Sequence, residues 1–149
     1  MKNIYETTTL GEITQRINTL TPDSPRQWGT MDVAQMMAHC SNALEVTVGD
    51  KFPKTTFMGK IVGRFAKGII TSEKPFKPGL PTDKSFIVKD NRDFDEEKQK
   101  LIKLLIRFST AGPSAMLNRK HPFFGHLTPN EWSRSTYKHI DHHLRQFGV

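Results

Sequence analysis

Hydrophobic residues recur every three or four positions along most of the chain, the spacing that puts them on one face of an α-helix. Ile13, Ile17 and Leu20 follow this spacing in a helix expected from about Thr9, after a threonine cap. A second helix is expected over residues 30–48. Its apolar stripe consists of Val33, Met37, Cys40, Leu44 and Val48. The segment TPDSPRQWG between the two contains prolines and a glycine, which interrupt helices.

Two further helices are expected in the second half of the chain. One precedes Gly112 and Pro113, and its inward-facing residues are Leu101, Leu104, Leu105 and Phe108. The other covers residues 129–147, and the sequence TPNEW gives it Thr128 as cap, Pro129 as first residue and Glu131 in a capping box. The candidate caps of the second and fourth helices are Thr30 or Asp32, and Asp93 or Asp95.

The middle of the chain combines a glycine-loosened helical pattern with a proline-rich connection. FMGKIVGRFAKGII, residues 57–70, predicts a third helix. TSEKPFKPGLPTDKSF, residues 71–86, contains three prolines and predicts a long ordered crossover. SFIVKD has the composition of a strand, but one short run cannot support a sheet. The pattern as a whole predicts an all-α protein, a four-helix bundle with a long crossover and a short extra helix.

Composition fits one soluble domain over residues 1–149, with 36% hydrophobic and 25% charged residues. No apolar run approaches the roughly 20 residues that cross a bilayer, and the first residues lack the apolar segment of a signal peptide. We therefore expect a cytoplasmic location and no membrane partner. The single cysteine, Cys40, excludes an internal disulfide, and its apolar setting favours a small buried hydrophobe over a nucleophile.

A net charge of +7 raises the question of nucleic-acid binding. The basic residues are spread along the chain, and no known nucleic-acid-binding motif accompanies them. A solvated basic surface is the favoured interpretation, and nucleic acid is a weaker alternative. Lys74 or Lys77 of the crossover could instead receive an anionic group, although a solvated loop is favoured there too.

Three of the six histidines lie in YKHIDHHLRQFG, close to the C-terminus. His139 and His143 are four positions apart, so on a helix they lie about 40° apart on one face and can bind the same metal ion. His142 is expected to contact the two ligands without binding the metal itself, or to face solvent. Taken alone, such a pair is more often a surface or hydrogen-bonding feature than a set of metal ligands.

A metal site needs a third ligand from elsewhere in the fold, and His39 is the candidate because it is the only other histidine inside a predicted helix. Three neutral histidines would leave the metal open to water or substrate. Gln35, Asn42 and Gln146 lie at helical spacing from these histidines and could orient them or contact substrate. The alternative for His39 is a core histidine with satisfied hydrogen bonds.

The chain resembles the DinB/YfiT-like superfamily of metalloenzymes over nearly its whole length. The resemblance is carried by WGTMDVAQMMAHCSNAL, residues 28–44, and KHIDHHLRQFG, residues 138–148. HPFFGHLTPNEW, residues 121–132, is similar to a narrower branch classed as a domain of unknown function. In the superfamily, one histidine of the second helix and an H-x-x-x-H pair of the last helix bind a divalent metal.

The resemblance implies a DinB-like bundle in which His39, His139 and His143 bind a divalent transition metal, zinc or nickel first, with manganese and iron as alternatives. Its better understood members are thiol S-transferases that use low-molecular-weight thiols such as bacillithiol or mycothiol, and others include a metal-dependent isomerase. A metal-dependent transferase or hydrolase acting on a small molecule is therefore the first hypothesis. The resemblance assigns no catalytic residue beyond the ligands.

A non-catalytic helical-bundle binding protein is the second hypothesis. In it the histidines form a hydrogen-bonded cluster.

The KHPFFGHLTP loop departs from the characterised transferases. His121 and His126 of this loop could lie at the mouth of a pocket, but a structural role for the loop is favoured. A homodimer through one face of the bundle is a further expectation, and the sequence does not indicate which face.

Overall fold

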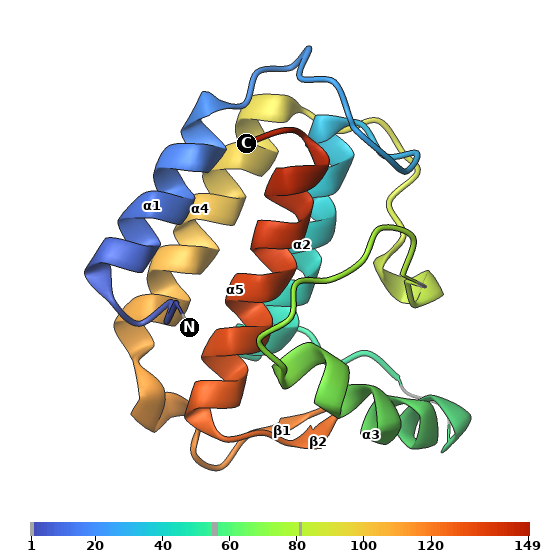
Figure 1. The fold of residues 1–149 in the computed structure, drawn as a ribbon, viewed down its shortest axis with the longest axis vertical. Helices are drawn as coiled ribbons and strands as arrows, with labels where there is room; N and C mark the ends of the chain where they lie inside the picture. Colours follow the sequence, from blue (N-terminus) through green and yellow to red (C-terminus); the bar gives the residue numbers. More distant parts are fainter. Residues whose placement is uncertain (1, 55–56, 81) are drawn as a thin grey trace.

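The structure of the protein, a computed structural model, describes residues 2–54, 57–80 and 82–149. The described residues form five α-helices: α1 (Thr7–Thr19), α2 (Val33–Val48), α3 (Phe57–Thr71), α4 (Phe94–Ala111) and α5 (Pro129–Gln146). Helices α1, α2, α4 and α5 lie side by side, whereas α3 lies across one end of the group (Figure 1). The predicted all-α fold class is confirmed.

The predicted apolar stripes form the core. Helix α2 contacts α4 and α5, and α1 contacts the same two helices. Every residue of the inward faces predicted for α1, α2 and α4 is buried, for example Ile13, Leu44 and Leu105. Ile140 of α5 is buried with them. Burial of these side chains stabilises the packed helices because it removes apolar surface from water. Cys40 is fully buried among them, with its sulfur 3.8 Å from that of Met36.

Polar caps set where three of the helices begin. Asp32, and not Thr30, caps α2 and forms a capping box with Gln35. Asp93, and not Asp95, accepts the capping hydrogen bond of α4. Thr128 forms the predicted capping box at the start of α5, with Pro129 in the first turn and Glu131 as its partner.

The beginning of α1 differs from the prediction. The helix starts at Thr7, two residues earlier than expected, and its cap is Glu6, whose side chain makes no capping hydrogen bond. The threonine cap was therefore a wrong prediction. The first turn is closed through the backbone, where the amide of Leu10 donates to the carbonyl of Glu6.

Two short segments also depart from the prediction. The RKHPFFGHL loop contains a hairpin of β1 (Lys120–His121) and β2 (Gly125–His126), paired antiparallel with Lys120 opposite His126. The strand-like window SFIVKD contains instead part of a 3-10 helix, η1 (Lys84–Phe86), because the Asp83 side chain accepts from the amide of Ser85.

The rest of the described crossover, within residues 72–93, is irregular as predicted. Pro81 of the crossover lies outside the described residues. A second 3-10 helix, η2 (Pro113–Met116), follows α4.

Helix α3 is attached to the hairpin and to α5. The ammonium of Lys67 donates to the carbonyl of His126 over 2.7 Å. At Gly63 the helix approaches the hairpin so closely that a Cβ atom would lie 2.1 Å from the carbonyl oxygen of Phe123. Glycine is therefore needed at this position to let the two backbones meet.

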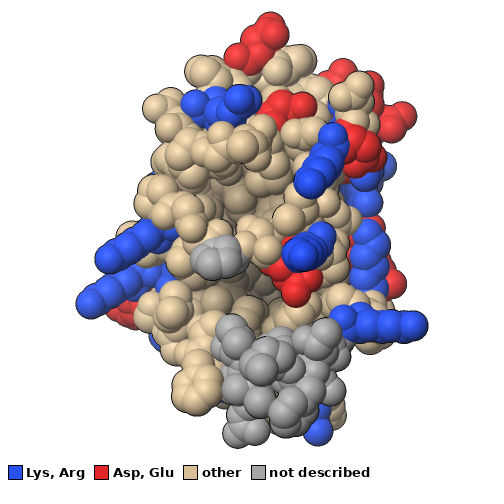
Figure 2. Space-filling model, turned by 90° about the vertical axis from the view of Figure 1, so that its right-hand side faces the viewer, with Lys and Arg blue, Asp and Glu red and all other residues tan. Residues whose placement is uncertain are grey.

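The crossover and α3 lie on one side of the bundle, and Figure 2 shows that side face on. Its centre is hollowed, and the floor of the hollow consists of residues other than Lys, Arg, Asp and Glu. Basic side chains stand around the hollow (Figure 2). Among the described residues, no helix combines the length and apolar character needed to cross a membrane.

Candidate metal centre

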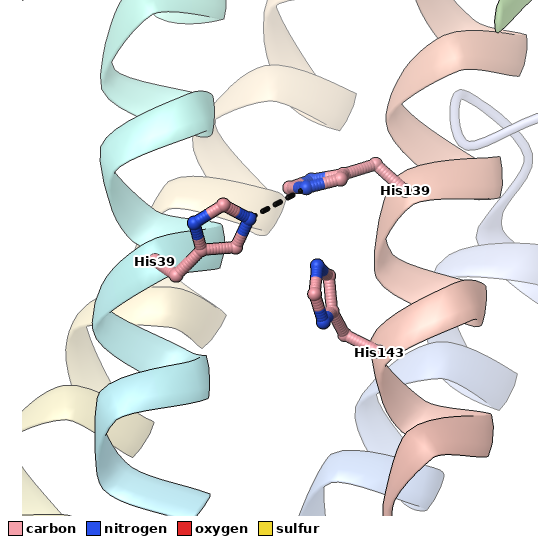
Figure 3. Close-up of side chains that lie close together, drawn as sticks. All are labelled: His39, His139 and His143. Atoms are coloured by element: carbon pink, nitrogen blue, oxygen red, sulfur yellow. Dashed lines mark hydrogen bonds between the residues drawn. The ribbon is translucent and has the colours of Figure 1, made fainter. Parts of the chain in front are cut away.

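Helices α2 and α5 bring three histidines together across their interface. His39 projects from the middle of α2, and His139 and His143 project from successive turns of α5 toward it (Figure 3). His39 and His143 are buried, at 4% and 8% exposed, and His139 is half-buried. A capping box fixes the first turn of each of the two helices, and with it the position of these histidines along the helix.

The spacing of the ring nitrogens suits one metal ion. One nitrogen from each histidine lies within 4.8 Å of the others. The Nε2 atoms of His39 and His139 are 3.0 Å apart. Two nitrogens bound to one tetrahedral zinc ion lie about 3.3 Å apart, since each Zn–N bond is about 2.0–2.1 Å. The remaining separations lie within 4.8 Å, so the rings would have to turn toward a common centre to bind one ion.

Each of two histidines has an acceptor on its outer nitrogen. Nδ1 of His39 lies 2.9 Å from the carbonyl oxygen of Phe86, and Nδ1 of His143 lies 2.8 Å from Oε1 of Gln146. The Gln146 amide is itself oriented, because its Nε2 donates to the carbonyl of Trp28 over 2.8 Å. A proton on each Nδ1 leaves Nε2 with a lone pair, which is the tautomer that a metal-binding histidine needs.

The contact between His39 and His139 is compatible with a hydrogen bond or with a shared metal ion. With Nδ1 of His39 donating to Phe86, its Nε2 presents a lone pair to Nε2 of His139. This lone pair can accept a hydrogen bond from the neutral tautomer of His139 that carries its proton on Nε2, or it can bind a metal ion shared by both rings. The donor set therefore fits a metal ion.

Burial keeps these imidazoles neutral. It lowers the pKa of His143 to about 3 and that of His139 well below the ordinary value, and repulsion from neighbouring histidines adds to the effect. Burial also lowers the pKa of His39, although the Phe86 carbonyl acts in the opposite direction. Neutral imidazoles are the form that binds metals.

His142 lies beside the three histidines rather than among them. It is buried, with its ring centroid 5.1 Å from that of His143. Its ring also contacts Trp28 and Phe76. Burial lowers the pKa of His142, and a backbone hydrogen bond with Phe76 acts in the opposite direction. Its buried Nδ1 has no hydrogen-bond partner among the described residues.

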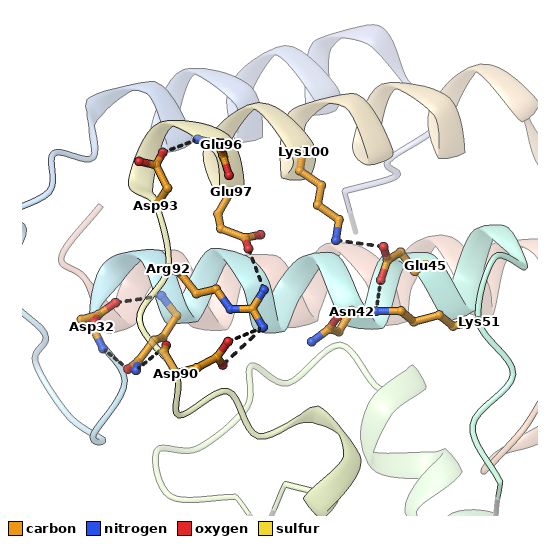
Figure 4. Close-up of polar contacts among 11 residues, drawn as sticks. Asp32, Asn42, Glu45, Lys51, Asp90, Arg92, Asp93, Glu96, Glu97 and Lys100 are labelled. Atoms are coloured by element: carbon orange, nitrogen blue, oxygen red, sulfur yellow. Dashed lines mark hydrogen bonds and ion pairs between the residues drawn. The ribbon is translucent and has the colours of Figure 1, made fainter.

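Gln35 and Asn42 have other partners. The Gln35 side chain completes the α2 capping box and donates to the carbonyl of Asp90. The Asn42 amide oxygen accepts from the ammonium of Lys51 over 2.7 Å (Figure 4). Among the described contacts, neither residue hydrogen bonds to a histidine of the group, whereas Gln146 does.

The end of the crossover is fixed between α2 and α4. Arg92 pairs with Asp90 over 3.0 Å and with Glu97 of α4 over 3.2 Å, while Gln35 of α2 holds the Asp90 carbonyl (Figure 4). These contacts help to hold the crossover, and with it the Phe86 carbonyl, against α2. The basic residues Lys74 and Lys77, earlier in the crossover, are exposed.

Sequence reasoning missed the loop residues that contact the histidines, namely Trp28, Phe76 and Phe86, and the buried Lys138. The loop residues follow no periodicity, so the pattern carried no signal for them. His121 belongs to the hairpin, where its Nδ1 accepts from the amides of Phe123 and Phe124. His126 is exposed at the hairpin end.

The fold and the site define a mainly helical protein with a largely buried three-histidine group that could hold a metal ion. Residues 2–148 match the family described as "Protein of unknown function (DUF1569)", and the chain belongs to that family. Comparisons with curated proteins and with solved structures give no match. The expected domain of unknown function is confirmed, and the DinB/YfiT-like relationship stays a prediction.

Proposed function

We propose that the protein is a metal-dependent enzyme in which His39, His139 and His143 hold a divalent transition metal, zinc or nickel foremost. The observation that carries this proposal is the meeting of three ring nitrogens within 4.8 Å of one another. The hydrogen bonds of Phe86 and Gln146 to two of the rings support it, because they orient the remaining nitrogens inward.

Three protein ligands leave one position of a tetrahedral metal open. A metal bound there supplies positive charge that lowers the pKa of a thiol or of water at this position. The chain's own contribution is to keep the imidazoles neutral by burial and to orient the rings of His39 and His143 by hydrogen bonds. These properties suit activation of a small nucleophile.

The resemblance to the DinB/YfiT-like superfamily narrows the reaction that we propose. Its thiol S-transferases use low-molecular-weight thiols, so transfer of such a thiol to a small molecule is the first reaction to test. Hydrolysis by an activated water is the second. The uncharged floor of the hollow on the crossover side is compatible with a small-molecule substrate (Figure 2).

One observation favours a non-catalytic alternative. The 3.0 Å contact between His39 and His139 is also the distance of an ordinary hydrogen bond, as in a protein that uses the histidines only to join α2 and α5. That protein would bind no stoichiometric metal.

Elemental analysis of protein purified without an affinity tag separates the two. We expect about one equivalent of a divalent transition metal per chain, and loss of that metal in His143→Ala because two histidines bind weakly. The matched control is His126→Ala, which removes an exposed histidine of the hairpin. Wild-type protein without metal after exposure to zinc and nickel would support the alternative, and unchanged metal in His143→Ala would refute the ligand set.

A further inference from the structure

We propose that the small molecule bound beside the three histidines is a neutral aromatic compound with a hydroxyl group, that is, a phenol. The proposal rests on the proposed function for the role of this ligand, whereas its binding depends only on the chain. Four aromatic side chains, which we name the aromatic rim, carry the argument: Trp28, Phe76, Phe86 and Phe123.

The aromatic rim flanks the histidines from both helices. On the α5 side, the rings of Trp28 and Phe76 have centroids 5.5 and 5.8 Å from that of His142, the neighbour of His143. On the α2 side, Phe86 holds His39 through its carbonyl, and its ring lies 6.0 Å from that of Phe123. Three separate loops supply these residues: the α1–α2 connection, the crossover and the hairpin turn.

Exposure distinguishes the aromatic rim from the other aromatic residues. All four rim residues are half-buried. Phe108 and Trp132 of the core are 0% and 2% exposed, whereas Phe52 and Phe65 on the surface are 84% and 83% exposed. The rim therefore keeps part of its aromatic surface accessible while its rings are held in place, which is typical of the wall of a ligand site.

The surroundings of the rim favour an uncharged ligand. Lys138 is the cation that lies over a rim ring in the described part of the chain, 4.5 Å from the centroid of Phe76. Its ammonium already donates to the carbonyls of Ile69 and Ser72 and to the Ser72 hydroxyl. A ligand anion would have to compete with those oxygens, whereas a neutral ring would stack without displacing them.

His142 adds a requirement for one polar group. It is 8% exposed, its ring contacts both Trp28 and Phe76, and its buried Nδ1 lacks a partner among the described residues. A buried ring nitrogen without a partner is unfavourable, and a ligand hydroxyl would satisfy it in either tautomer because it can both donate and accept. The combination of aromatic walls and one buried histidine nitrogen selects a phenol over a plain arene or an aliphatic alcohol.

The two tryptophans of the chain allow a direct test by nitrogen–proton correlation NMR. The indole N–H signal of Trp28 reports on the rim, and that of Trp132, in the core, is the internal control. We expect phenol to shift the Trp28 signal and to leave that of Trp132 in place. Toluene, which lacks the hydroxyl, and cyclohexanol, which lacks the aromatic ring, should each bind roughly tenfold more weakly. On metal-free protein, benzoate should bind still more weakly, because its charge would lose hydration against the aromatic walls.

Two variants test the separate parts of the site. His142→Phe keeps a ring between Trp28 and Phe76 but removes the nitrogen, so phenol should lose its advantage over toluene. Phe76→Leu should weaken phenol and toluene alike, whereas Phe65→Leu, on the exposed face of α3, should weaken neither. An unchanged Trp132 signal shows that each variant has folded. Equal affinity for phenol and cyclohexanol, or equal shifts of both indole signals, would overturn the proposal.

The same samples separate this proposal from the metal site. Titrations are run on metal-loaded protein and on protein treated with a chelator, with metal content measured in each. Phenol binding at Trp28 in a protein that takes up no metal would keep the aromatic site and reject the proposed enzyme. Stoichiometric metal without a preference for phenol would do the reverse.

Discussion

The orientation of His143 depends on a single amide side chain. Oε1 of Gln146 accepts from Nδ1 of His143, and its Nε2 donates to the carbonyl of Trp28. The second bond fixes the first, because an amide that donates to Trp28 must present its oxygen to the histidine. The α1–α2 connection thus helps to set the tautomer of a residue in α5.

Removal of this amide should weaken metal binding without removing a ligand. We expect Gln146→Leu to lower zinc affinity about 10- to 100-fold, the usual effect of losing an outer partner of a metal-bound histidine. A competition titration with a chromogenic chelator measures the change. Gln99→Leu, at an exposed position of α4, is the matched control. Equal affinities in the two variants would show that Gln146 does not orient His143.

Lys138 attaches helix α3 to helix α5. Its side chain is buried, with the residue 6% exposed, and its ammonium donates to oxygens at the end of α3. Burial lowers the pKa of this lysine, and the carbonyls at the helix end compensate for the lost hydration. The bond therefore links the start of the crossover to the helix that carries His139 and His143.

Lys138→Met should loosen α3 and the crossover together. The carbonyls of Ile69 and Ser72 would lose their donor, which we expect to cost about 1–3 kcal/mol of stability. Hydrogen exchange should become faster in residues 69–76 and stay unchanged in α4. Lys103→Met, at an exposed position of α4, supplies the control. Unchanged protection of residues 69–76 would contradict the attachment.

The start of a helix could be predicted from the sequence wherever a side chain caps the helix. Asp32, Asp93 and Thr128 were among the predicted caps, and the structure uses all three. Helix α1 was misplaced because its first turn has no side-chain cap to recognise. The hairpin was missed because strands of two residues are too short to show alternation.

The candidate site was predictable in part for a similar reason. His139 and His143 share a face because of local helix geometry, and His39 was the only other histidine in a predicted helix. The Phe86 carbonyl and the aromatic rim come from loops, where position depends on tertiary contacts such as those of Arg92 with Glu97. No local pattern encodes such contacts.

Buried neutral histidines make the stability of the whole molecule depend on pH. The pKa of His143 is lowered by burial to about 3 and that of His121 to about 4, whereas an unfolded histidine titrates at about 6.5. Between these values the unfolded chain binds more protons than the folded chain, so the free energy of unfolding falls as the pH falls.

We expect metal-free protein to lose about 2–4 kcal/mol of stability between pH 7.5 and pH 5. Urea unfolding in the presence of a chelator measures the loss. His121→Phe should reduce it, because one titrating group is removed, while His126→Gln at the exposed end of the hairpin should not. Stability that stays constant across this pH range would show that the histidines are not buried in neutral form.

His39 and His139 meet across one hundred residues of chain. A contact between residues so far apart in sequence requires closure of a long loop, so it forms only when α5 packs against α2. During synthesis, His39 is made long before the pair that completes the group. The three-histidine group is therefore complete only in a chain whose helices α2 and α5 have already packed together.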